Sequence, residues 1–278
     1  MNREIRALLR LSMDGIRSQL LSATEWDIYH GEQVMQGLEQ TIRNLNDDMI
    51  SAFRDQANRA STLALAGVDD PLVSMGFNAS IYPHAPPVAH LNLISRVLPN
   101  QIVDITTEIQ KSVQQVFQQV LMGGASTRDA IAKIGELVGP LDGPRGLMKP
   151  GQIMPRAEVR ARTIFRTELN RVGNITARVR IDELAERDAG IGKQWLHFPS
   201  HAPRDNHAAL HGTVVYPAKG EKFVVAGIKV DGPHDPMLPA SEIVNCHCKV
   251  VAYYDPDAPG MDMDPILADQ GAGLEDVR

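Results

Sequence analysis

The sequence has few aromatic residues and no long apolar run. Phe, Trp and Tyr make up 5% of its 278 residues, although hydrophobic residues together reach 43%. No stretch of about 18 apolar residues is present, so we expect no transmembrane helix. The N-terminal segment is amphipathic, contains acidic residues and lacks the apolar block of a signal peptide. These absences predict a protein that folds in a reducing cytoplasm and contacts no membrane.

Cysteine is scarce, and positive charge is not in excess. The two cysteines, Cys246 and Cys248, are too few to form a disulfide framework. The formal net charge of -6 excludes a generally basic nucleic-acid coat protein. The charge is unevenly distributed, because residues 156–180 hold seven arginines and two glutamates, whereas residues 255–278 hold seven acids and one arginine. The sequence therefore predicts a positive helix in the middle and a flexible acidic tail at 255–278.

The N-terminal quarter of the chain has the periodicity of α-helix. Residues 1–67 are predicted to be helical with one break at Ser22-Ala-Thr-Glu25, a capping box that satisfies free amides at a helix start. After the break, apolar residues recur at steps of three and four: Leu38, Ile42, Leu45, Met49 and Phe53. So narrow a stripe needs a partner, which is either another helix of this chain or a neighbouring subunit. We predict that residues 1–138 form a helical, partner-binding region.

Prolines and glycines divide the middle of the chain. Residues 68–103 contain five prolines and are predicted to be irregular. Helical periodicity returns over residues 104–137, with a new helix start at Ser126. Residues 139–155 are rich in Gly and Pro and form the predicted linker between two domains.

The predicted second domain, residues 156–254, mixes helix and strand. An arginine-rich helix is expected from about Pro155 to Asp188. Short apolar runs separated by Gly, Pro and Asp turns then predict strands at 194–198, 222–225, 228–230 and 249–254. The predicted fold class is therefore α+β, with an elongated and mostly helical N-terminal region followed by a small α+β C-terminal module.

Histidines and cysteines gather in the C-terminal module. Six of the nine histidines lie there, at 197, 201, 207, 211, 234 and 247. His207 and His211 are four residues apart, which places them on one face of a helical turn, and Cys246 and Cys248 share one side of an extended strand. Two imidazoles and two thiolates form a tetrahedral set for structural zinc. The alternative is that the cysteines are small core residues and the histidines are hydrogen-bonded surface groups.

No catalytic motif accompanies this cluster. A hydrolytic metal site needs an open coordination position and a carboxylate base, for which Asp205, Asp231 and Asp235 are candidates. The sequence lacks His-Glu-x-x-His, Gly-x-Ser-x-Gly, a Walker loop and a dinucleotide-binding turn. We predict that the protein is not an enzyme, and a metal-dependent nuclease or other hydrolase is the alternative.

The arginine-rich helix has two interpretations. Its candidate contacts for DNA phosphates or for a protein partner are Arg156, Arg160, Arg162, Arg166 and Arg171. Because these residues point in different directions around a helix, a solvated or protein-contacting face is favoured over one basic stripe. Any DNA binding is expected to be weak and non-specific, because the chain is acidic and lacks nearby aromatic residues for base stacking.

Three sequence elements, in order and spacing, resemble the Mu F-like head-morphogenesis family of tailed-phage minor head proteins. They are Phe-Arg-Thr-Glu at 165–168, His-Ala-Ala-Leu-His-Gly at 207–212, and Asn-Cys-His-Cys at 245–248. The resemblance covers residues 115–254. The positions that carry the family motif, besides the histidines and cysteines above, are Arg166, Thr167, Glu168, Asn174, Trp195, Leu210, Gly212 and Asn245.

The resemblance implies a protein of the virion, located in the head or portal region and assembled in the host cytoplasm, without established catalytic activity. Its implied partners are the portal protein, capsid or scaffold proteins, further copies of the chain, and genomic DNA. The chain departs from the family at Arg204 and Ile243, where members with a fuller set of metal-type residues carry Cys and His. A bound zinc would therefore need His211 or His201 as a ligand.

Overall fold

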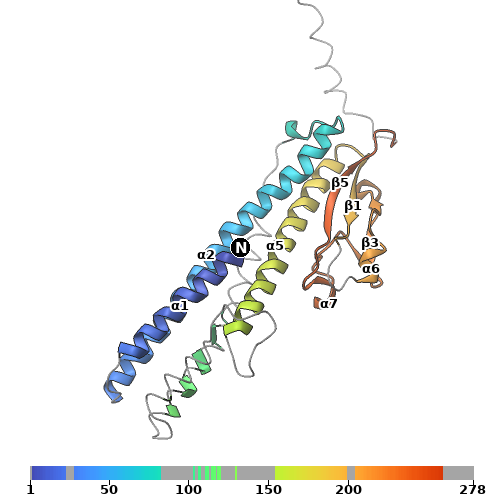
Figure 1. Cartoon of the computed structure of the whole chain (residues 1–278). Helices are drawn as coiled ribbons and strands as arrows, with labels where there is room; N and C mark the ends of the chain where they lie inside the picture. The colour runs from blue at the N-terminus through green and yellow to red at the C-terminus, as the bar shows by residue number, and fades with distance from the viewer. Residues whose placement is uncertain are drawn as a thin grey trace, which may run out of the picture. The chain divides into compact units, whose positions relative to one another are not determined.

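The computed structural model describes residues 2–22, 28–82, 154–198 and 204–258, with separate helical positions between 103 and 129. Long helices precede a small antiparallel sheet, which confirms the α+β fold class (Figure 1). The chain divides into two compact units, 1–56 with 92–166 and 57–91 with 167–278. Residues 139–153 of the predicted linker lie outside the described residues, and its last two residues belong to a helix, so the predicted domain boundaries stay a prediction. Within the described part of the chain, no helix is both long and apolar enough to cross a membrane.

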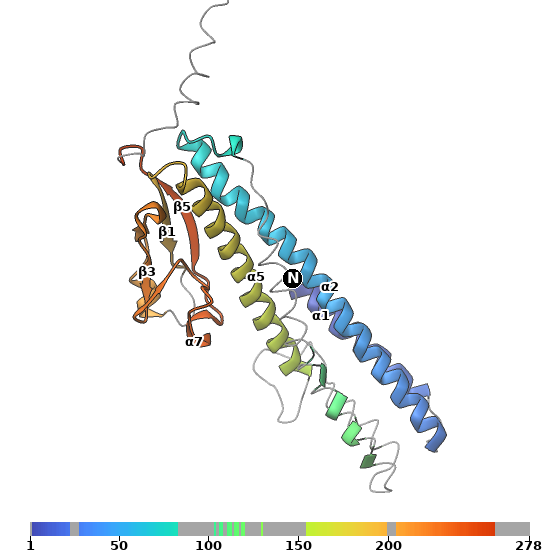
Figure 2. The same cartoon turned by 180° about the vertical axis from the view of Figure 1, so that it is seen from behind.

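The first unit contains two antiparallel helices, α1 (Asn2–Ser22) and the first part of α2 (Ile28–Ser74). Gln56 donates a hydrogen bond to Glu4 over 3.1 Å, and Gly15 lies against Thr41, so the two helices run in opposite directions. Both views show α1 alongside this part of α2 (Figures 1 and 2). The capping-box break between them falls partly outside the described residues.

The apolar stripe of α2 is the core of the first unit. All five of its residues, from Leu38 to Phe53, are at most 6% exposed. Phe53 meets Phe165 edge to face, with 5.4 Å between the ring centroids. The partner that the stripe needs is therefore supplied within this chain, and a neighbouring subunit is not required. The partner-binding role of residues 1–138 stays a prediction that has to rest on other surfaces.

Helix α2 continues beyond the predicted end of the helical segment. It runs to Ser74 with Pro71 inside it, whereas the sequence predicted irregular structure from residue 68. A proline inside a helix costs about 3 kcal/mol. Val68 and Leu72, on either side of Pro71, are almost completely buried, and this burial offsets the cost. The prediction for residues 68–74 was wrong because the proline signal ignored the tertiary contacts of that last turn.

The second unit is built on the later part of α5 (Met154–Ala185) and a sheet of order β2-β1-β5. In this antiparallel sheet, β1 (Ile191–Leu196) pairs with β2 (Val214–Val215) and with β5 (Lys249–Tyr254). A hairpin of β3 (Phe223–Val225) and β4 (Ile228–Val230) lies beside β1 and away from α5 (Figure 2). Short helical turns complete the unit: η1 (Ala79–Ile81), α6 (Asp205–Ala208), η2 (Pro217–Lys219) and α7 (Ala240–Ile243).

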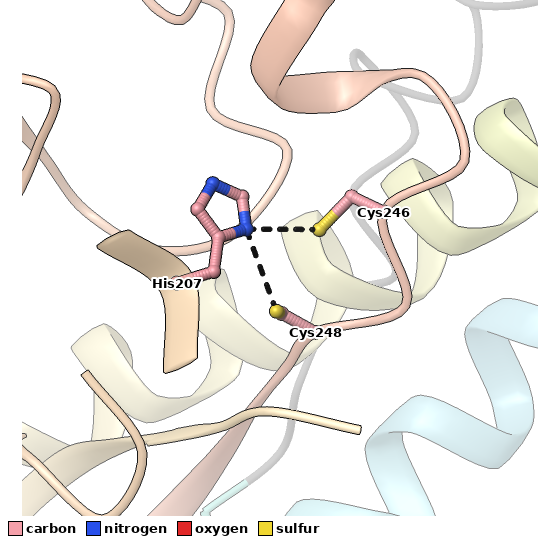
Figure 3. Close-up of side chains that lie close together, drawn as sticks. All are labelled: His207, Cys246 and Cys248. Atoms are coloured by element: carbon pink, nitrogen blue, oxygen red, sulfur yellow. Dashed lines mark hydrogen bonds between the residues drawn. The ribbon is translucent and has the colours of Figure 1, made fainter. Parts of the chain in front are cut away.

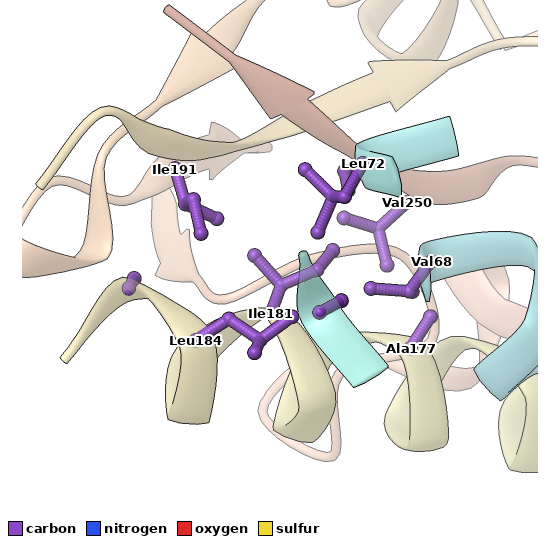
Figure 4. Packing of buried hydrophobic residues seen from close by; sticks show 10 residues of the cluster. Val68, Leu72, Ala177, Ile181, Leu184, Ile191 and Val250 are labelled. Atoms are coloured by element: carbon purple, nitrogen blue, oxygen red, sulfur yellow. The ribbon is translucent and has the colours of Figure 1, made fainter. Parts of the chain in front are cut away.

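One hydrophobic cluster joins α2, α5 and the sheet within the second unit. Val68 and Leu72 of α2 meet Ile181 of α5, together with Ile191 of β1 and Val250 of β5 (Figure 4).

A charged pair is buried close to this cluster. Arg180 is 1% exposed and donates hydrogen bonds to both carboxylate oxygens of Asp69, at 2.8 and 3.2 Å, and to the carbonyl of Ala79. A buried charge needs such a partner, so the pair fixes the end of α2 against α5.

Candidate metal centre

Three of the four predicted metal ligands come together in the second unit. His207 lies on α6, while Cys246 and Cys248 lie in the segment between α7 and β5. His207 Nδ1 is 3.5 Å from Cys246 Sγ and 3.6 Å from Cys248 Sγ, and all three side chains are 2% exposed. Figure 3 shows the imidazole nitrogen facing both sulfurs. We call these three residues the His-Cys-Cys cluster.

His211 does not join the cluster. Helix α6 ends at Ala208, and the next turn is closed by bonds of the i to i+3 type, including one from His211 N to Ala208 O. These tighter turns rotate His211 away from the face on which His207 lies. Its side chain is exposed, and its Nδ1 accepts a hydrogen bond from the backbone N–H of His197 over 3.1 Å. The helical spacing predicted for these two histidines is therefore absent.

A different histidine approaches the sulfurs. Nδ1 of His197, directly after β1, lies 3.5 Å from Cys248 Sγ. The other candidate, His201, lies outside the described residues. Residue spacing offers no reason to prefer His197, because its proximity to Cys248 depends on the pairing of β1 with β5.

A carboxylate lies behind the His207 ring. Glu242 of α7 places Oε2 2.9 Å from His207 Nε2, and Asn206 Nδ2 donates to the same oxygen over 3.2 Å. The His207 and Glu242 atoms are close without being aligned as a hydrogen bond, and the opposite edge of the ring, at Nδ1, faces the two sulfurs. Glu242 was missed by the sequence reasoning, because its position relative to His207 depends on how α6 and α7 pack.

Helix α5 holds the segment that carries the two cysteines. Asn170 Nδ2 donates to the carbonyl of Cys246 over 3.0 Å, and Asn174 Nδ2 donates to the carbonyl of Cys248 over 3.1 Å. Asn174 Oδ1 also accepts from the N–H of Val250 over 2.9 Å. These bonds satisfy buried backbone groups that have no strand partner, so α5 takes the place of a neighbouring strand.

The first and last family elements meet at Asn245. Thr167 Oγ1, next to Arg166 in the Arg-Thr-Glu element, accepts a hydrogen bond from Asn245 N over 3.3 Å. Asn245 has φ of 57°, in the left-handed region that asparagine tolerates better than most residues. The residue types at both positions are therefore explained by the path of the chain toward Cys246.

The remaining motif residues surround the cluster. Trp195 is fully buried and packs edge to face with His207 at 5.5 Å and with Phe223 at 5.3 Å. Leu210 is partly buried against the hydrophobic cluster that contains Trp195 and Phe223. Gly212 turns the chain with φ of 80°. Glu168 is buried and pairs with Arg171 over 3.0 Å, and burial raises the pKa of its carboxyl group.

The two neighbouring thiols shift each other's pKa in opposite directions. The hydrogen bond with Cys248 lowers the pKa of Cys246 to about 2, with further lowering from His207 and His234, although burial acts in the opposite direction. The pairing with Cys246 and the burial raise the pKa of Cys248. The cluster therefore brings together two cysteine sulfurs and one imidazole nitrogen, which are donor atoms that soft divalent metals prefer.

Several charged residues considered earlier are engaged elsewhere. Arg178 pairs with Asp235 over 2.7 Å, and Lys222 pairs with Asp231 over 3.2 Å. The two candidate carboxylate bases among these residues are therefore held in ion pairs, and Asp205 is exposed on α6.

The arginine contacts for DNA or a partner stay predictions. Arg160 is exposed, Arg162 and Arg166 are half-buried, Arg171 pairs with Glu168, and the Arg156 side chain lies outside the described residues.

The fold and the cluster define a class of protein. It is an α+β chain in which asparagine side chains of a long helix form hydrogen bonds with a Cys-x-Cys segment of the C-terminal sheet module. A family described as Phage Mu protein F like protein matches residues 111–251, which is half of the chain. The chain belongs to this family, and the resemblance inferred from its motifs is confirmed. No curated protein and no solved structure matches the chain. Membership indicates a structural protein related to phage heads, with other head or capsid components as partners.

Replacing Asn174 tests the contact between α5 and the cysteine segment. We expect Asn174→Ala to lower the free energy of unfolding by about 2–4 kcal/mol, because it leaves the carbonyl of Cys248 and the N–H of Val250 buried without partners. Urea titration followed by circular dichroism measures the change. Asn58→Ala, at an exposed position on α2, is the matched control and should change stability by about 0.5 kcal/mol or less. Equal effects of the two substitutions would contradict this role of Asn174.

Proposed function

We propose that this protein is a non-enzymatic minor head protein that associates with the portal vertex or the capsid interior and assists head assembly or DNA delivery. The observation that carries the proposal is the family match across α5 and the sheet module, where the motif residues form one set of contacts. These contacts build a rigid module and leave the helices to offer surface to other proteins.

Exposed apolar side chains on the helices are candidate contacts for the portal or the capsid. Leu11 on α1 is 69% exposed and Leu63 on α2 is 73% exposed. Single exposed leucines are common on protein surfaces, so each is a candidate for substitution and not by itself an interface. The buried stripe from Leu38 to Phe53 takes no part in this proposal.

Head assembly in the phage that encodes the chain tests the proposal. Deletion of its gene should give aberrant or empty heads, and supply of the wild-type chain from a plasmid should restore them. Mass spectrometry of purified heads should find the chain at a few copies per particle, and cross-linking should join it to portal or capsid protein. Normal, filled and infectious heads in its absence would refute the assembly role.

A metal-dependent nuclease has less support. At the His-Cys-Cys cluster, the Glu242 carboxylate faces His207, and Asp231 and Asp235 are engaged in ion pairs with basic side chains. Incubation of the purified chain with plasmid DNA and Zn²⁺ or Mg²⁺ separates the two functions. Cleavage that is lost in His207→Ala would favour the nuclease, whereas intact plasmid is expected here. Genomic DNA, if bound, should be held weakly and released as salt rises.

A further inference from the structure

We propose that His207, Cys246 and Cys248 bind a structural Zn²⁺ ion, and that His197, and not His211, is the fourth ligand. The site lies within the second unit and would link the end of β1 to α6 and to the start of β5. This inference is independent of the role in head assembly.

The spacing of the donor atoms fits tetrahedral zinc. Zinc bonds of about 2.3 Å to sulfur and about 2.0 Å to nitrogen, at tetrahedral angles, separate a sulfur from a nitrogen by about 3.5 Å. The two distances from His207 Nδ1 to the cysteine sulfurs are 3.5 and 3.6 Å. All three donor atoms also lie within 4.8 Å of one another. A zinc ion can therefore enter without a rearrangement of the backbone.

The His207 ring is already oriented as a metal ligand. Histidines that bind metals commonly donate their other N–H to a carboxylate, which fixes the ring and makes the ligating nitrogen more basic. Glu242 lies on that side of the ring, with Oε2 2.9 Å from His207 Nε2 and a side chain that is 16% exposed.

A hydrogen-bond donor and two asparagines surround the two cysteines. The Trp195 indole N–H has no hydrogen-bond partner among the described residues, and a metal-bound thiolate would accept it. Asn170 and Asn174 fix the carbonyls of the two cysteines, so both sulfurs are held in place before a metal arrives.

His197 is the best candidate for the fourth position. Its Nδ1 lies 3.5 Å from Cys248 Sγ, the separation expected for two ligands of one zinc ion, and its side chain is half-buried. His234 is engaged through Nε2 with the carbonyl of Cys246 over 3.1 Å. Arg204, which replaces a cysteine of some family members, instead donates to the carbonyls of Ser241 and Val244.

Metal analysis of the full-length chain, purified without a histidine tag, tests the site. The wild-type chain should contain about one zinc per chain, and Cys248→Ser and His207→Ala should contain none. Replacement of the metal by Co²⁺ should give tetrahedral d–d absorption with thiolate charge-transfer bands. A folded wild-type chain that takes up neither Zn²⁺ nor Co²⁺ would overturn the proposal and leave the cysteines as core residues.

Substitutions of His197 and of His211 test which histidine is the fourth ligand. Zinc affinity, measured by competition with a chromophoric chelator, should fall by at least about 10-fold in His197→Ala. It should stay near the wild-type value in His211→Gln, because the amide oxygen of glutamine can still accept the hydrogen bond from His197 N–H. Glu242→Gln should lower the affinity by about 10- to 100-fold, because the His207 ring loses its carboxylate neighbour. Wild-type affinity in His197→Ala would overturn the assignment of His197.

Discussion

Leu45→Asp is expected to lower the unfolding free energy by about 4 kcal/mol or more and to unfold the first unit at room temperature. Leu45 is 2% exposed among the helices of that unit, so the substitution places a carboxylate in an apolar core. Thermal and urea unfolding followed by circular dichroism should show loss of helical signal under conditions in which the wild-type chain is folded.

Leu63→Asp is the matched control, because it makes the same substitution on the same helix at a residue that is 73% exposed. It should change the unfolding free energy by about 1 kcal/mol or less. The pair also separates two interpretations of the stripe. If it bound a partner, Leu45→Asp would stay folded and lose only association, and that result would contradict the packing described above.

Asp69→Ala is expected to destabilise the second unit by about 3–5 kcal/mol, because it leaves the Arg180 guanidinium buried without its counter-charge. The two residues form a bidentate pair at 2.8 and 3.2 Å, and no other carboxylate approaches Arg180 as closely within the described residues. Equilibrium unfolding in urea measures the change.

Glu39→Ala is the control for Asp69→Ala. Glu39 and Arg43 form a surface pair on α2 at 3.9 Å, and such pairs contribute about 0–1 kcal/mol. If both variants lose a similar amount of stability, the burial of Arg180 is not the cause of the loss in Asp69→Ala. Asp69→Asn should be intermediate, because the amide keeps part of the hydrogen bonding and loses the charge.

The elements with local signals were predicted well from the sequence. Helix α5 was expected from Pro155 to Asp188 and is found at Met154–Ala185, and β4 and β5 have the predicted bounds. Apolar periodicity and flanking turn residues are local, so they locate such elements directly. The two-residue strand β2 carries no such signal, because it exists only through its pairing with β1.

In the candidate site, too, residues with a local sequence signal were predicted, and residues that approach through tertiary packing were missed. Spacing alone placed Cys246 and Cys248 on one side of the chain and pointed to His207. Spacing failed for His211, because the turn after α6 is closed by hydrogen bonds between residues three apart, whereas an α-helix would join residues four apart. His197 and Glu242 reach the cluster only through the packing of β1 and α7, which no sequence window contains.

The core of the second unit combines residues that the ribosome synthesises at widely separated times. It combines Val68 and Leu72 with Val250, which leaves the ribosome about 180 residues later. At translation rates of about 5–20 residues per second, the end of α2 waits roughly 10 to 40 s for its last partner strand. A nascent chain interrupted before Cys246 lacks both β5 and the Cys-x-Cys segment. The core of the second unit can therefore be completed only after β5 has been synthesised.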